Sequence, residues 1–191
     1  VSDMAGRASI ELKSQELGID LKGDRELIGR VVDRVKEMES HGFTFEAADA
    51  SFELLLLEEL SGTRPKFFTI EHWLTTTERG EDQSIVTKAE VTVIALGKKI
   101  SCEGTGNGPV NALDKALRAA LEKIYPELAK LELIDYKVRI LEGVKGTGAV
   151  TRVLIETTDG NSQWDTVGVH ENVIAASWNA ISDAVTYGLL K

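Results

Sequence analysis

The strongest constraint on the fold is a pattern that occurs twice after residue 66. Three short segments of alternating apolar residues precede an amphipathic helix, first over residues 67–130 and again over residues 131–191. When the second helix is placed on the first, Leu117 coincides with Ile181 and Leu121 with Val185. A period of two indicates half-buried strands, whereas apolar residues three or four apart indicate a helix. The sequence therefore predicts two successive βββα units with pseudo-twofold symmetry.

Residues 1–62 show a helical period instead. One helix is predicted to close near Gly18, and Asp24 is predicted to cap a second. A third is predicted to carry an apolar stripe that starts at Phe45 and to end near Gly62. The period then changes at residues 61–66. The predicted fold class is α+β, in which a helical subdomain (residues 1–62) precedes a duplicated βββα domain with antiparallel sheets (residues 67–191).

Two local details follow from the alternating segments. Four residues at alternate positions are predicted to share one face of the first strand, namely Phe68, Ile70, His72 and Leu74. His72 is therefore interpreted as a packed or interfacial residue. In the second repeat, Asp159-Gly160 predicts a hairpin turn.

A glycine-rich stretch, Gly104-Thr105-Gly106-Asn107-Gly108, runs directly into the first of the two repeated helices. The glycines are expected to allow positive φ and close backbone approach, and Pro109 fits the first helical position. Unpaired N–H groups there, with the helix dipole, favour a small anion such as a carboxylate. A simple turn is the alternative. Nucleotide binding is disfavoured, because neither the dinucleotide fingerprint nor a phosphate-binding loop is present.

Composition excludes several classes. The net charge of −9 disfavours nucleic acid as a partner, and the longest apolar cluster is far too short to span a membrane. The single cysteine, Cys102, cannot form an internal disulfide, which suits a cytoplasmic location. The three histidines lie in separate elements, so no metal site is predicted. No catalytic residue is predicted either.

Several segments resemble the regulatory domain of the 2-isopropylmalate synthase/citramalate synthase family. They are residues 106–117, 133–141, 151–157 and 164–178, and the resemblance extends upstream through residues 1–7 and 45–55. It thus covers nearly the whole chain. Within this family, the segments are most similar to the citramalate synthase branch.

The resemblance implies a parent enzyme that condenses acetyl-CoA with a 2-oxo acid. Such an enzyme is an acyltransferase that converts the acyl group to alkyl on transfer, and it uses a divalent metal in an N-terminal (β/α)8 barrel. That barrel is not in this sequence, so no cofactor is expected here, and the chain alone is expected to be inactive. By the same resemblance, residues 1–62 correspond to a helical linker subdomain and residues 67–191 to a dimeric regulatory domain.

The resemblance also implies feedback inhibition by a branched-chain amino acid and assembly as a homodimer. Isoleucine fits the citramalate synthase branch of isoleucine biosynthesis. Leucine sensing by a 2-isopropylmalate synthase, in leucine biosynthesis, and a purely structural dimerisation module are the alternatives.

Effector-binding residues are predicted by the same resemblance in three groups. They are Gly106, Asn107, Gly108, Pro109 and Val110 at the helix entry, Leu133, Asp135 and Tyr136 opposite, and Ala149, Asn172 and Val173. Asp135 would accept hydrogen bonds from an ammonium group, although a strand-end aspartate in a turn is the alternative reading. His170 stands where the family often has serine, so the resemblance does not predict which hydrogen bonds cap the helix there.

Overall fold

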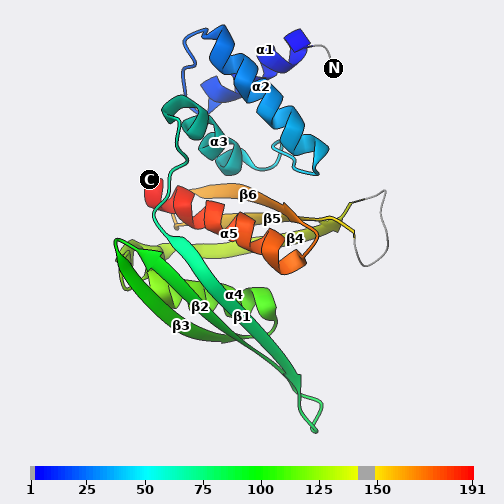
Figure 1. Cartoon of the computed structure of the whole chain (residues 1–191), viewed down its shortest axis with the longest axis vertical. Helices are drawn as coiled ribbons and strands as arrows, with labels where there is room; N and C mark the ends of the chain where they lie inside the picture. Colours follow the sequence, from blue (N-terminus) through cyan, green and yellow to red (C-terminus); the bar gives the residue numbers. More distant parts are fainter. Residues whose placement is uncertain (1–2, 142–148) are drawn as a thin grey trace. The chain divides into compact units, whose positions relative to one another are not determined.

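The computed structural model describes residues 3–141 and 149–191 (Figure 1). Its elements are α1 (Asp3–Glu16), α2 (Arg25–Ser40), α3 (Asp49–Ser61), β1 (Thr69–Arg79), β2 (Ile85–Ala95), β3 (Lys98–Gly106), α4 (Pro109–Leu121), the 3-10 helix η1 (Pro126–Lys130), β4 (Glu132–Ile140), β5 (Thr151–Thr158), β6 (Gln163–His170) and α5 (Val173–Leu190). The strands form two three-stranded antiparallel sheets, β1-β2-β3 and β4-β5-β6. The fold is therefore α+β, and its element order agrees with the predicted βββα duplication. None of the described helices is long and apolar enough to cross a membrane.

Contacts divide the chain into two compact units. The first comprises Val1–Pro65, Asp135–Glu156 and Trp164–Ala184, and the second comprises Lys66–Ile134, Thr157–Gln163 and Val185–Lys191. The first unit thus joins the N-terminal helices to most of the second βββα repeat.

The predicted helix boundaries around α2 and α3 are mostly confirmed. The Asp24 carboxylate accepts hydrogen bonds from the N–H groups of Glu26 and Leu27, both at 3.1 Å. Gly62 ends α3 in the left-handed region, with φ of +79°. The predicted start of this helix was wrong, because Phe45 lies before it and α3 begins at Asp49. Phe45 is nonetheless buried, since its ring packs 6.0 Å from that of Phe52, so tertiary packing produced the apolar signal.

In the first unit, helices cover both faces of the sheet β4-β5-β6. On one face, α5 packs closely, and the Thr166 hydroxyl and the Trp164 indole N–H donate hydrogen bonds to backbone carbonyls of α5 at 2.7 and 3.1 Å. On the other face, Leu154, Val167 and Val169 join the core that α1, α2 and α3 form. A three-stranded sheet covered on both faces buries apolar side chains on each.

In the second unit, α4 covers one face of the sheet β1-β2-β3 (Figure 1). Val91 and Val93 of β2 and Leu113 and Leu117 of α4 are fully buried. The other face of this sheet carries mainly polar side chains, among them the hydrogen-bonded hydroxyl groups of Thr92 and Ser101. One apolar face and one polar face are typical of an antiparallel sheet.

The predicted inward face of β1 was wrong beyond Ile70. A β-bulge interrupts the register, since Ile70 pairs with Val93 but His72 pairs with the adjacent Thr92. The extra residue reverses the alternation, so Trp73 is half-buried while His72 and Leu74 are exposed. His72 is therefore not packed in the described part of the chain.

Candidate functional site

The entry to α4 holds the first group of predicted effector residues. Gly106 ends β3, Gly108 is the N-cap residue and Pro109 occupies the first turn, as predicted. The Asn107 N–H points to the Asn111 side-chain oxygen at a distance of 3.4 Å. Within the described chain no side chain caps α4. Its first N–H groups are therefore open to an external acceptor, because helical N-termini leave such donors unsatisfied.

The glycines before α4 serve close approach rather than unusual backbone angles. The prediction of positive φ was wrong for Gly104, Gly106 and Gly108, and Gly108 is fully extended with φ of −168°. The predicted close approach is confirmed. A Cβ on Gly104 would lie 2.5 Å from the Ala112 carbonyl oxygen, whereas a Cβ on Gly108 would meet no atom within 4 Å.

The equivalent entry to α5 is already capped. The Asn172 side-chain oxygen accepts hydrogen bonds from the N–H groups of Ile174 and Ala175 at 2.9 and 3.1 Å. The Asn172 N–H donates to Nδ1 of His170 at 2.9 Å, which shows what this histidine does at the position where serine was expected. The two repeats therefore differ, because side chains satisfy the N-terminus of α5 and leave that of α4 open.

The second group of predicted residues lies on β4, where neighbouring side chains point to opposite faces. Leu133 and Asp135 are half-buried on one side, and the Asp135 carboxylate pairs with Lys137 at 3.2 Å. Tyr136 points to the α5 side, where its hydroxyl lies 2.8 Å from that of Ser177. Asp135 and Tyr136 therefore lie on opposite faces of β4, so a small ligand that contacts the Asp135 carboxylate does not also contact the Tyr136 hydroxyl.

The face of β4-β5-β6 that carries Asp135 holds charges of both signs, since Asp165 lies near Glu156 and Lys137, and Arg152 lies near Arg139. Burial, followed by the charges of Glu156 and Asp49, raises the pKa of Asp165, whereas Lys137 acts in the opposite direction. The charges on this face therefore do not by themselves favour a cation over an anion.

The last predicted residues are Ala149 and Val173. Ala149 is buried just before β5, and Val173 is the first residue of α5 and is exposed. Asp135, Tyr136, Ala149, Asn172 and Val173 belong to the first unit, and Leu133 and the loop before α4 belong to the second. The residues from Gly106 to Val110 lie together at the entry to α4.

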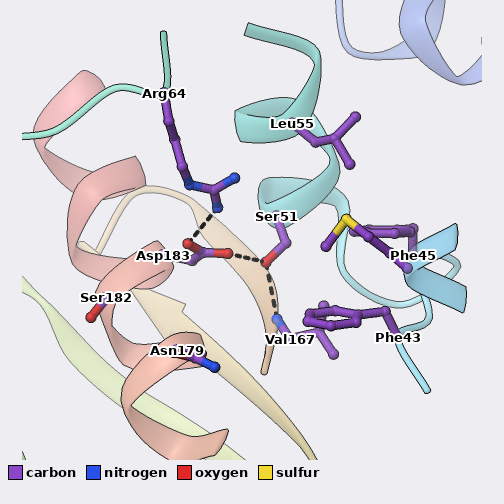
Figure 2. Close-up of a pocket in the computed structure, with 10 residues that line it drawn as sticks. Phe43, Phe45, Ser51, Leu55, Arg64, Val167, Asn179, Ser182 and Asp183 are labelled. Carbon is purple, nitrogen blue, oxygen red and sulfur yellow. Dashed lines mark hydrogen bonds and ion pairs between the residues drawn. The ribbon is translucent and has the colours of Figure 1, made fainter. Parts of the chain in front are cut away.

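A cavity of about 270 Å³ lies wholly within the first unit (Figure 2). It has an apolar wall from the end of α2, the segment after it, α3 and β6, and a polar wall from Arg64 and α5. Its lining residues are Met38, Phe43, Phe45, Ser51, Leu55, Arg64, Val167, Asn179, Ser182 and Asp183. The cavity thus combines aromatic side chains with a pair of opposite charges.

A hydrogen-bonded network forms the polar end of this cavity (Figure 2). The Asp183 carboxylate accepts from Arg64 at 2.6 Å and from the Ser51 hydroxyl at 2.8 Å, and the Ser51 oxygen accepts from the Val167 N–H at 3.0 Å. Burial raises the pKa of Asp183, although Arg64 and Ser51 act in the opposite direction. The network therefore joins α3, β6 and α5.

Sequence reasoning did not find this network, because its members are far apart in the chain. Ser51 and Asp183 are separated by 132 residues. Two signals were nevertheless present. Ser51 is a polar residue in an apolar stretch of α3, and Asp183 is the only charged residue of α5. Buried polar groups need hydrogen-bond partners, so both residues suggested a buried interaction.

The histidines and the cysteine occupy separate places. His41 Nδ1 lies 2.8 Å from the Glu37 carbonyl at the end of α2, His170 bonds Asn172, and Cys102 is half-buried with a free thiol. In residues 3–141 and 149–191 no three acidic, histidine or cysteine side chains form a group that could hold a metal ion.

Comparisons with known proteins agree with the resemblance seen in the sequence. The family of the LeuA allosteric (dimerisation) domain matches residues 46–189. Three relatives named (R)-citramalate synthase, from Streptomyces coelicolor, Geobacter sulfurreducens and Aquifex aeolicus, are 66%, 46% and 44% identical to this chain. Each match covers the whole chain but 36% of the relative. The chain therefore belongs to the LeuA allosteric (dimerisation) domain family.

Proposed function

We propose that this chain is the allosteric and dimerisation domain of an (R)-citramalate synthase and binds isoleucine as a feedback inhibitor. The observation that carries the proposal is the 66% identity, over all 191 residues, with a relative of that name. The chain spans about a third of the relatives' length. In this proposal, the condensation of acetyl-CoA with a 2-oxo acid and the divalent metal belong to the catalytic barrel of the parent enzyme. The chain by itself then has no condensation activity.

The effector carboxylate is proposed to bind at the N-terminus of α4. The support is the contrast between the repeats, since Asn172 caps α5 but no described side chain caps α4. The N–H groups of Val110 and Asn111 lie in this open first turn, where the helix dipole favours negative charge.

Gly108→Asp is expected to weaken isoleucine binding at least tenfold, which corresponds to about 1.4 kcal/mol. Aspartate is a favoured N-cap residue, so its carboxylate would occupy the N–H groups that the effector needs. The extended backbone and the open space at Gly108 accommodate a side chain, so the variant is expected to fold. Isothermal titration calorimetry of the full chain measures the change.

Gly108→Ala is the matched control, because it adds a methyl group without a charge. The difference between the two variants isolates the effect of the carboxylate. Undiminished affinity in Gly108→Asp would place the effector elsewhere. If the unmodified chain binds neither isoleucine nor leucine, the purely structural dimerisation module is the better description. Tighter binding of leucine than of isoleucine would favour a 2-isopropylmalate synthase.

The chain is expected to form a homodimer at micromolar concentration, as the family description implies. β4 is an edge strand of its sheet, and it exposes Val138 and Ile140. Apolar side chains on an edge strand favour association with a second copy. Multi-angle light scattering should give twice the mass of one chain. If the measured mass stays equal to that of one chain at all protein concentrations up to about 100 μM, this domain does not dimerise.

A further inference from the structure

The cavity in the first unit is a candidate site for a very small molecule. Its volume of about 270 Å³ lies just below the range of about 300–1,000 Å³ that is typical of ligand pockets. The rings of Phe43 and Phe45 lie on one side, and Asn179 and Asp183 of α5 lie on the other (Figure 2). A ligand in this space would contact apolar and charged groups at once.

The charged end offers a carboxylate and a guanidinium side by side. One Asp183 oxygen accepts a hydrogen bond from Arg64 at 2.6 Å and the other accepts one from Ser51 at 2.8 Å. Each carboxylate oxygen has room for another donor. Arg64 also contacts Glu58 at the longer distance of 3.3 Å. A guanidinium has five N–H donors, and the bonds to Asp183 and Glu58 use only part of them. Both charges can therefore accept a further partner.

An additional cation would also stabilise the charged form of the Asp183 carboxylate. Burial raises its pKa despite the contacts with Arg64 and Ser51, so its negative charge is incompletely compensated. An ammonium group beside it would supply the missing compensation. The neighbouring aromatic rings add a favourable surface for a cation or an aliphatic chain.

We propose that this cavity binds a small α-amino acid with an apolar side chain. Its ammonium group would contact Asp183, its carboxylate would contact Arg64, and its side chain would pack against Phe43, Phe45 and Val167. The ammonium and carboxylate groups of such a molecule are attached to the same carbon, which places them close enough to face the adjacent Asp183 and Arg64. The site is separate from the N-terminus of α4 and shares with the proposed function only the class of ligand.

The test uses the full chain carrying Gly108→Asp, in which the proposed α4 site is blocked. L-Leucine and L-isoleucine are expected to bind this variant by calorimetry. Isopentylamine lacks the carboxylate and 4-methylpentanoate lacks the ammonium, so each is expected to bind at least tenfold more weakly. Adding Asn179→Trp, which fills the mouth of the cavity from an exposed position on α5, is expected to weaken amino-acid binding at least tenfold. Ala119→Trp, at an exposed position on α4 outside the cavity, is the matched control.

The outcomes separate this inference from the proposed function. Binding that disappears in Gly108→Asp alone would overturn the cavity site and support the α4 site. Binding that persists in Gly108→Asp and is unaffected by Asn179→Trp would overturn the cavity site as well. Equal binding of the amine or the acid would overturn the amino-acid assignment. Nuclear Overhauser contacts between the ligand methyl groups and the Phe43 ring need no variant in the cavity, and their absence at saturation would contradict the inference.

Discussion

Gly168→Ala is expected to lower the free energy of unfolding by about 3 kcal/mol, at the upper end of the usual range for overpacking. A Cβ at this position of β6 would lie 1.9 Å from the Ala176 carbonyl oxygen and 2.8 Å from the Ala180 nitrogen. Both are backbone atoms of α5, so no side-chain rotation relieves the collision. The helix would have to move away from the sheet, and packing on that face of the first unit would be lost. Urea denaturation followed by circular dichroism measures the change.

Gly108→Ala is the control for this prediction. Gly108 is extended, and a Cβ there meets no atom within 4 Å. Its effect is expected to stay within about 1 kcal/mol, because alanine makes no new contact there but is a poorer N-cap residue than glycine. If both variants unfold at the same urea concentration, the close approach of β6 to α5 does not exist in solution.

Ser51→Ala is expected to lower the free energy of unfolding by about 2–3 kcal/mol, because two buried groups lose their partner at once. The Ser51 oxygen accepts the Val167 N–H at 3.0 Å, and its hydroxyl donates to Asp183 at 2.8 Å. Ser51 is 3% exposed and Val167 is 2% exposed, so water does not replace these bonds easily. The Val167 N–H belongs to β6, an edge strand, where Ser51 takes the place of a further strand.

Ser61→Ala is the matched control on the same helix. Its hydroxyl oxygen lies 2.7 Å from the Leu57 carbonyl oxygen and 2.8 Å from that of Thr63, so its one proton has two backbone acceptors in reach, but the residue is exposed to solvent. Its loss is expected to change the free energy of unfolding by less than about 0.5 kcal/mol. Equal urea midpoints for the two variants would show that Ser51 does not hold α3 against β6 and α5.

Gly104 and Gly168, which lie against helices, show how much of the structure the sequence repeat predicts. Gly104 precedes Ala112 and Ala116 by the same spacings that separate Gly168 from Ala176 and Ala180. These sets of small residues mark the places where a strand meets the backbone of a helix. The repeated helices were predicted from Leu117 and Ile181, but the meaning of the glycines was partly misread, because flexibility and close approach give the same residue preference.

The candidate sites were predictable to different degrees. The loop from Gly106 to Val110 was placed correctly at a helix entry, because Gly108 and Pro109 are local signals for one. The sequence carried a signal that α4 is uncapped and α5 capped, because Gly108 has no side chain and Asn172 is a favoured N-cap residue, but only the structure showed the bond from Asn172 to His170. The cavity could not be predicted at all, because Ser51, Arg64 and Asp183 meet only after the chain has returned to itself.

Short-range patterns were sufficient for the order of helices and strands, the caps at Asp24 and Gly62 and the turn at Asp159-Gly160, which joins β5 to β6. Each of these features depends on residues that are close together in the sequence, where intrinsic propensity and the spacing of apolar residues determine the local structure. Only the tertiary structure decided the bulge that exposes His72, the burial of Phe45 outside its predicted helix and the network around Asp183. These features depend on contacts between distant segments, and the free energy of those contacts outweighs the local preferences from which a sequence is read.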